Sequence, residues 1–327
     1  MPVGNSDKGV GLFAGQIMVG ADFNYQYIDW KHDPLKNSDD SFETDENGHP
    51  VGHHIGTLSA YVVNPSITIG LSDYWNFTFS QVIGKRHMTW GNDRESVHHR
   101  SEDSNSNFIN AIGGLLGDSR LMFRYLAINA GAGVGNRLFF GGGLVIPSKN
   151  TLTSDPFFLN GDEPEPHRHF SMSEGVYKGV IETQYFIKRV TNPVFVGGTF
   201  SIEEPLGESE HGFKASRMID LSFTAFTKKI NFINGSAGAS LMFRRTYEGF
   251  WNGEPAPNSE SLLVTPGVGL LLNAKIGVVA LNLQRPFFID GGVSGGGNSA
   301  SQEETSVWQI SVSFRRILDY SIPWLYW

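Results

Sequence analysis

The chain has 327 residues, a formal net charge of −8 and no cysteine. This acidic balance argues against a nucleic-acid partner, which needs clustered positive charge. The lack of cysteine fits an oxidising compartment in which the fold needs no disulfide. No uninterrupted apolar run is long enough for a membrane helix, so a helical membrane protein is excluded.

The N-terminal residues 1–14 are small and include several glycines. They lack the basic start and the apolar core of a secretory signal. They form either a tail outside the folded domain, which we favour, or a small plug inside it.

Segments of about ten residues follow in which apolar and polar side chains alternate, as in strands whose two faces meet different solvents. In residues 218–227, Ile219, Leu221 and Phe223 share one face, and Asp220 and Ser222 share the other. The same rhythm predicts twelve strands, at residues 16–30, 55–71, 74–90, 117–129, 136–147, 174–188, 193–203, 217–229, 236–249, 262–273, 278–289 and 305–318.

The connections between these segments alternate between long and short. Five short turns carry Gly, Asn or Asp, which tight turns need. The six others, such as residues 31–54, 91–116 and 148–173, are long and polar. Long loops at one end and tight turns at the other are typical of an antiparallel up-and-down transmembrane β-barrel, which places the protein in the outer membrane of a Gram-negative bacterium.

A short stretch in the middle of the chain resembles a known family. Gly117-Asp118-Ser119-Arg120 is followed by Leu121-Met122-Phe123-Arg124-Tyr125 and then by Leu144-Val145-Ile146-Pro147-Ser148. These residues are similar to motifs of the outer-membrane transporters associated with the MetA pathway of phenol degradation, relatives of the FadL-type channels. The resemblance implies a β-barrel that passes hydrophobic compounds.

Charged residues recur on the face opposite the apolar one. The candidates for lining the lumen are Arg120, Arg124, Lys178, Glu182, Lys188, Glu203, Asp220 and Arg244. Because both signs are present, these residues either pair and stiffen the barrel or leave unpaired arginines as a polar track for an anionic or aromatic acid.

Prolines fall inside three predicted strands, where each removes a ladder donor. In FadL-type channels a kinked strand opens a lateral exit, and Pro266 with Pro286 are the candidates for such an opening. The alternative is a rim or bulge position for these prolines, and Pro65 is equally a break in the second strand.

Histidines gather in the predicted outer loops. His49, His53, His54, His167 and His169 are weak metal candidates, because imidazole suits Zn or Cu but no defined ligand spacing is present. We expect no cofactor and no specific metal.

The chain ends in an apolar aromatic segment, residues 319–327, after a barrel spanning residues 15–318. Ile322-Pro323-Trp324-Leu325-Tyr326-Trp327 either extends the last strand or forms a site for a protein partner or for the membrane interface.

These observations predict a passive outer-membrane channel for small, hydrophobic or aromatic molecules, in contact with outer-membrane lipid and lipopolysaccharide. One alternative is a structural or adhesive barrel that binds a partner through its outer loops or its C-terminal segment. A second is an outer-membrane lipid hydrolase, which is disfavoured because only His87 approaches a strand and no nucleophile motif is present. We therefore expect no enzyme activity.

Overall fold

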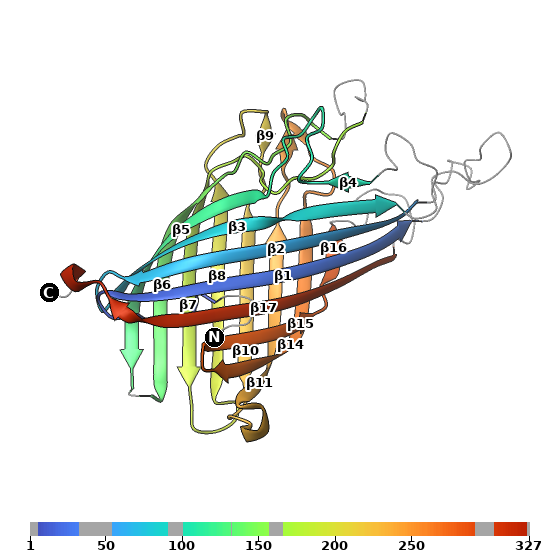
Figure 1. Cartoon of the computed structure of the whole chain (residues 1–327). Helices are drawn as coiled ribbons and strands as arrows, with labels where there is room; N and C mark the ends of the chain where they lie inside the picture. The colour runs from blue at the N-terminus through green and yellow to red at the C-terminus, as the bar shows by residue number, and fades with distance from the viewer. Residues whose placement is uncertain are drawn as a thin grey trace, which may run out of the picture.

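A computed structural model describes residues 6–32, 54–90, 101–131, 133–156, 166–291 and 304–325. Twelve long strands form one antiparallel sheet that closes on itself (Figure 1). It closes because the first strand, β1 (Gln16–His32), pairs with the last, β17 (Glu304–Ser321), and each of the other long strands pairs with its neighbours in the chain. The predicted twelve-stranded barrel is confirmed.

The strands follow one another around the barrel in chain order. They are β1 (Gln16–His32), β2 (His54–Gly70), β3 (Trp75–Trp90), β5 (Leu116–Ala130), β6 (Gly135–Ile146), β7 (Lys178–Lys188), β8 (Phe195–Pro205), β10 (Met218–Phe226), β11 (Gly235–Thr246), β14 (Ser261–Ala274), β15 (Gly277–Gln284) with its continuation β16 (Phe287–Gly291), and β17 (Glu304–Ser321).

The wall is taller on one side than on the other. β1, β2, β3 and β17 have 16 to 18 residues, whereas β10 has 9. About 9–11 tilted residues suffice to cross a bilayer, so the four long strands reach beyond it. They form the tilted front of the barrel in Figure 1.

Short strands and 3-10 turns lie outside the long strands, at the two ends of the barrel. The strands β4 (Glu102–Asp103), β9 (Phe213–Lys214), β12 (Phe250–Trp251) and β13 (Glu254–Pro255) lie in the long loops, and two 3-10 turns are η1 (Asn231–Ile233) and η2 (Pro323–Leu325). Among the described residues no helix has the length and apolar character that a membrane span requires.

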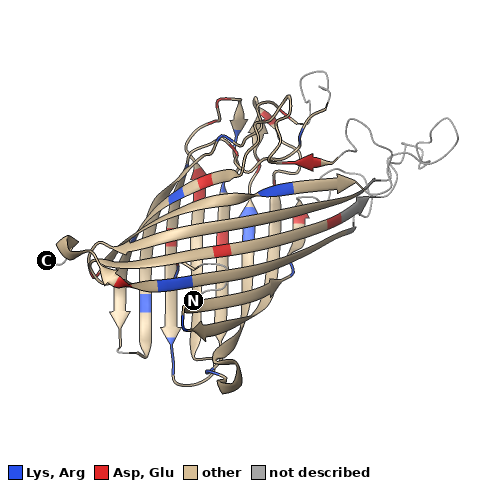
Figure 2. Ribbon diagram, viewed as in Figure 1, with Lys and Arg blue, Asp and Glu red and all other residues tan. Residues whose placement is uncertain are grey.

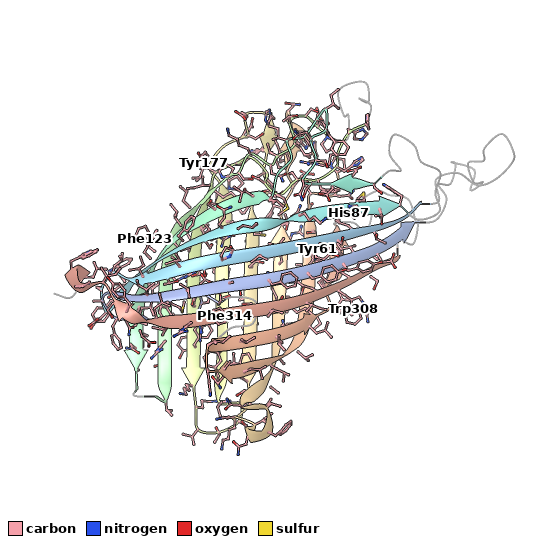
Figure 3. The ribbon with its side chains drawn as sticks, viewed as in Figure 1. Tyr61, His87, Phe123, Tyr177, Trp308 and Phe314 are labelled. Atoms are coloured by element: carbon pink, nitrogen blue, oxygen red, sulfur yellow. The ribbon has the colours of Figure 1, made fainter. Side chains whose placement is uncertain are left out.

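The outer wall is apolar and aromatic. Exposed side chains on it include Tyr61, Phe123, Tyr177 and Trp308, all labelled in Figure 3. The opposite face buries polar side chains such as Thr78, which bonds Thr68 at 2.9 Å. This inversion of the usual soluble pattern is what a membrane barrel with a polar lumen requires.

All twelve predicted strands are present with bounds that shift by a few residues, and two differences near the C-terminus are larger in consequence. The predicted strand 278–289 is interrupted at Arg285-Pro286, and the last strand runs to Ser321 before η2 begins. Residues 6–15 lie inside the barrel, as their contacts show below.

Candidate functional site

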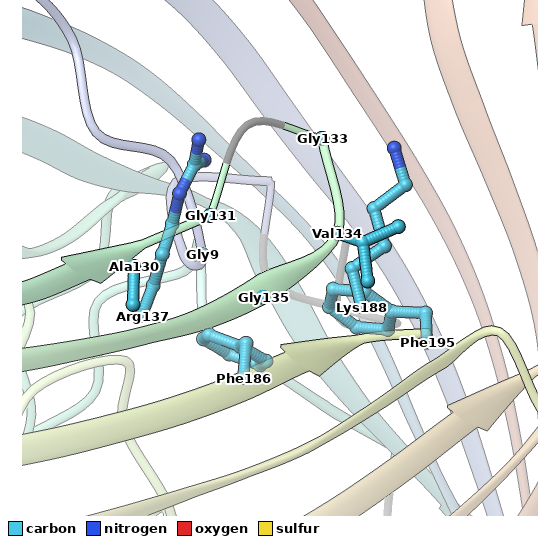
Figure 4. A pocket seen from close by; sticks show the side chains of 10 residues that line it. All are labelled: Gly9, Ala130, Gly131, Gly133, Val134, Gly135, Arg137, Phe186, Lys188 and Phe195. Atoms are coloured by element: carbon cyan, nitrogen blue, oxygen red, sulfur yellow. The ribbon is translucent and has the colours of Figure 1, made fainter. Parts of the chain in front are cut away.

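Charged residues of both signs lie along the strands of the barrel (Figure 2), and several of them border a cavity in the lumen. A cavity of about 510 Å³ is bordered by six of the eight predicted residues, namely Arg120, Arg124, Lys178, Glu203, Asp220 and Arg244. Glu182 is buried beside Arg124. Lys188 lies away from this group, at the short-turn end, where it borders a smaller cavity of about 160 Å³ (Figure 4).

Most of these charges have partners of opposite sign. Arg244 makes two bonds to Asp220, at 2.7 and 3.2 Å. Arg120 pairs with Glu203, and Lys178 pairs with Glu174. The two opposite charges within each pair largely cancel. The electrostatic field of these pairs in the cavity is therefore weak and does not select strongly for one sign of ion.

The N-terminal segment, defined here as residues 6–15, runs up the lumen from the short-turn end. The amide of Ala14 donates to Asp73 in the β2–β3 turn at 3.1 Å, and Leu12 is buried. Further up, the amide of Gly9 donates to Gln184 at 2.9 Å. The hydroxyl of Ser6 donates to Asp22 of β1 at 2.9 Å.

A buried ionic network holds this segment to the wall. Arg124 donates to Asp7 at 2.6 Å and to Glu182 at 2.7 Å, and Lys8 lies 3.3 Å from Glu182. The Arg124 and Glu182 side chains are 4% and 2% exposed. Burying a charge without a partner costs free energy, and Asp7 and Lys8 are the partners that the segment supplies to Arg124 and Glu182. The network therefore favours one position of the segment in the lumen.

The segment divides the lumen into two spaces. Asp7 and Lys8 border the upper cavity, whereas Val10 borders a second cavity of about 450 Å³ at the short-turn end. The lower cavity is also lined by Met18 and Arg315. A solute that enters from the outer side therefore meets the N-terminal segment before it reaches the lower cavity.

The wall above the upper cavity is not fully hydrogen-bonded. The β15–β17 ladder runs from Val278 opposite Arg315 to Gln284 opposite Gln309. Beyond that pair, no ladder joins β16 to β17 within the described part of the chain. There β16 pairs with β14, and β17 pairs with β1. We call this interruption the wall gap; it lies between residues 287–290 of β16 and residues 304–308 of β17.

The wall gap meets the lumen at its lower edge. Gln284 and Gln309, the last paired residues below the gap, both border the 510 Å³ cavity. The wall gap therefore lies beside the cavity. An unpaired stretch of strand edge is unfavourable in lipid, where backbone groups have no other partner.

The predicted prolines occupy different places relative to the gap. Pro286 lies between β15 and β16, and having no N–H it cannot continue the ladder to β17. Pro266 stays inside β14, paired with Leu241, and its carbonyl accepts the amide of Arg285 at 3.0 Å. Pro65 pairs with Ala21, and the β2–β3 ladder skips it.

The outer loops are organised by a buried arginine. Arg168 donates to the carbonyls of Ser104, Ser106 and Ile112 at 2.9, 2.7 and 3.0 Å, and its amide donates to Asn110. Burial lowers the pKa of the Arg168 guanidinium to about 10, against the opposite effect of nearby carboxylates. We call Arg168 and the residues that it bonds the cap, which joins the long loop between β6 and β7 to the long loop between β3 and β5.

Two of the metal candidates lie together in this cap. The Nε2 atoms of His167 and His169 are 3.1 Å apart, and His169 Nδ1 is 2.7 Å from Glu102. Among the described residues, no group of three or more such side chains is arranged so that it could hold a metal ion. His49 and His53 lie outside those residues, and His54 begins β2. The expectation of no specific metal site therefore stays a prediction.

The hydrolase alternative depends on His87, whose described neighbours do not include a bonded nucleophile. His87 of β3 lies opposite Ser59 of β2, but the Ser59 hydroxyl lies 3.5 Å from the backbone carbonyl of His87. His87 Nδ1 is 3.9 Å from Asp103, beyond hydrogen-bond distance. This is not the bonded nucleophile and base that hydrolysis requires.

Several lumen residues were not predicted. Asp22, Arg86, Asp118 and Arg315 face cavities, and the alternation of their strands was a usable signal for Asp22, which stands between Ala21 and Phe23. Asp7 and Lys8 carry no periodic signal, because the N-terminal segment is not a strand.

Comparisons with known proteins agree on the fold. No protein-family model and no curated protein matches the chain. Among solved structures, an outer-membrane channel from Pseudomonas putida F1 has a TM-score of 0.58 and 13% identity, covering 95% of this chain and 99% of that one.

More distant matches include the P. putida toluene transporter TodX and a Pseudomonas aeruginosa FadL homologue. Both are 10% identical, with TM-scores of 0.43 and 0.40, and cover 93% and 94% of this chain and 90% of each of theirs. The likeness to the P. putida F1 channel shows the fold. The protein is a bacterial outer-membrane β-barrel.

Proposed function

We propose that this barrel is a passive channel for small apolar or aromatic molecules, which leave sideways through the wall gap. The observation that carries the proposal is the end of the β15–β17 ladder at Gln284 and Gln309, two residues that also border the upper cavity. A solute in that cavity is therefore next to a described part of the wall where the ladder between two neighbouring strands ends.

The lining of the cavity suits an apolar solute with some polar character. Met172, Met218 and Met242 border it together with Val62 and Val82. Methionine side chains adapt to irregular apolar shapes and contact aromatic rings favourably. The remaining lining is polar or ion-paired, which allows water to fill the cavity between passages.

The N-terminal segment acts, in this proposal, as a plug that directs solute to the side. It separates the upper from the lower cavity and is held by Arg124 and Gln184. A straight path to the periplasm requires this segment to move. A lateral path into the membrane does not, and lipid is a favourable destination for an apolar solute.

The solute class rests on the cavity and on the sequence resemblance to hydrophobic-compound channels. The likeness to the P. putida F1 channel supports a channel in general. The association with the MetA pathway of phenol degradation remains a prediction.

A disulfide staple across the gap tests the lateral route. Continuing the register of Leu283 opposite Ile310 places Phe287 opposite Ser306. Because the chain has no cysteine, the pair Phe287→Cys and Ser306→Cys is the only thiol pair introduced. Oxidation should stop uptake of radiolabelled toluene by cells that produce the protein, and reduction should restore it.

The matched control is Leu283→Cys with Ile310→Cys, a pair already inside the ladder. Its oxidation should leave uptake unchanged. If the Phe287–Ser306 staple forms and uptake continues at the unstapled rate, the lateral route is wrong.

A structural or adhesive barrel is the second candidate, favoured by the ordered cap around Arg168 and by Trp324, which is 71% exposed in η2. It predicts binding of a protein partner that is lost when the cap or the C-terminal segment is trimmed, with no effect of the staple.

A further inference from the structure

An arginine interrupts the lipid-facing row beside the wall gap. The outward positions of β15 and β16 are Leu281, Leu283, Arg285, Phe287 and Ile289, and all five are exposed on the barrel wall. Four of them are apolar, as lipid requires. A charged side chain on that face is costly at depth, so Arg285 needs a compensating contact.

The contact that Arg285 makes spans the wall gap. Its guanidinium carbon lies 5.3 Å from the ring centre of Phe287 and 5.1 Å from that of Trp308. Phe287 belongs to β16 and Trp308 to β17, the two strands that no described ladder joins. Both distances are within the range of a cation–π interaction.

The backbone fixes where this side chain starts. The amide of Arg285 donates to Pro266 of β14, so its main chain belongs to the β14 side of the gap. The register that ends at Gln284 opposite Gln309 places Arg285 opposite Trp308 at the next position. The side chain thus bridges the two strands at the first position where the backbone does not.

We propose that Arg285 is the gating residue of the lateral exit: its guanidinium latches the Phe287 ring to the Trp308 ring, and a planar aromatic solute leaves by taking its place between them. The inference rests on the proposed lateral route. It names planar aromatic molecules as the preferred solutes, because the ring faces that bind the guanidinium also stack on another ring.

Three variants of the full-length protein test the latch, with the initial rate of toluene uptake as the readout. Arg285→Gln removes the cation and should raise the rate about five-fold, the effect of losing about 1 kcal/mol of exposed cation–π interaction with the two rings. Trp308→Leu removes one ring and should give a similar rise. Arg285→Lys keeps the cation and should stay close to the wild-type rate.

The double variant Arg285→Gln with Trp308→Leu should be no faster than either single variant, because both remove the same latch. The control is Arg217→Gln, an arginine 5.8 Å from the Tyr247 ring and ion-paired with Glu204, away from the gap. It should not change uptake. Heat-dependent migration in gels shows which variants are folded.

An uptake rate of Arg285→Gln at or below that of the wild type overturns the latch, as does a double variant whose effects multiply. The staple separates this failure from that of the lateral route. If the oxidised Phe287–Ser306 staple blocks uptake while Arg285→Gln takes up toluene at the wild-type rate, the lateral exit is supported and the latch is wrong. If the staple has no effect on uptake by cells, the lateral route itself is wrong.

Discussion

Replacing Asp7 with alanine should release the N-terminal segment while leaving the barrel wall intact. The Asp7 carboxylate accepts a bond from Arg124 at 2.6 Å and is 20% exposed. A hydrogen bond to a charged group contributes about 1.5–3 kcal/mol. Because Asp7 is partly solvated, we take about 2 kcal/mol, which corresponds to a roughly 30-fold rise in the ratio of released to bound segment.

Arg124 keeps Glu182 and Thr78 as partners in this variant, so the wall should not lose its buried network. Single-channel recording in a planar bilayer reads the released state as longer or larger openings. A truncated chain lacking residues 2–15 gives the fully released reference. Asp319→Ala is the control, since Asp319 is 94% exposed and pairs only at the surface, with Arg316.

Traces of Asp7→Ala that match the wild type, while the truncated chain conducts more, would refute the role of the Asp7 and Arg124 contact. Traces in which the truncated chain also matches the wild type would show that the segment does not obstruct the lumen at all.

Further substitutions probe other parts of the molecule. Gly197→Ala places a Cβ about 2.0 Å from the Phe186 ring, so it should destabilise the barrel by about 1–3 kcal/mol in heat-dependent gel migration; an unchanged transition would contradict this packing. Arg168→Ala leaves three carbonyls of the cap without their donor and should speed proteolysis of the loops with little change in barrel stability. If His167 and His169 chelate Cu²⁺, titration calorimetry should show binding by the wild type that His169→Ala lacks, and no binding by the wild type would reject chelation by this pair.

The barrel architecture was predictable because it depends on local patterns. Period-two alternation identifies strands, and loop lengths identify the two ends, so residues such as Asp220 and Phe223 were assigned to opposite faces correctly. The interruption at Pro286 was also visible, because proline lacks the ladder donor wherever it stands.

The partners of the lumen charges were not predictable in the same way. Alternation predicts that Arg120 and Glu203 face inward. The two residues are 83 positions apart in the sequence, and their contact depends on the curvature and stagger of the closed barrel. The place of Asp7 depends on buried charge partners contributed by distant strands. No local pattern encodes such partners.

The most direct test of the central claim compares toluene uptake by cells that produce the protein with the ion conductance of the purified protein, each with and without the Phe287–Ser306 staple. A lateral channel predicts that the staple abolishes uptake by the cells while ion conductance through the lumen in a planar bilayer stays at its unstapled level. Uptake that survives the staple, or that rises and falls with the lumen conductance, would contradict it.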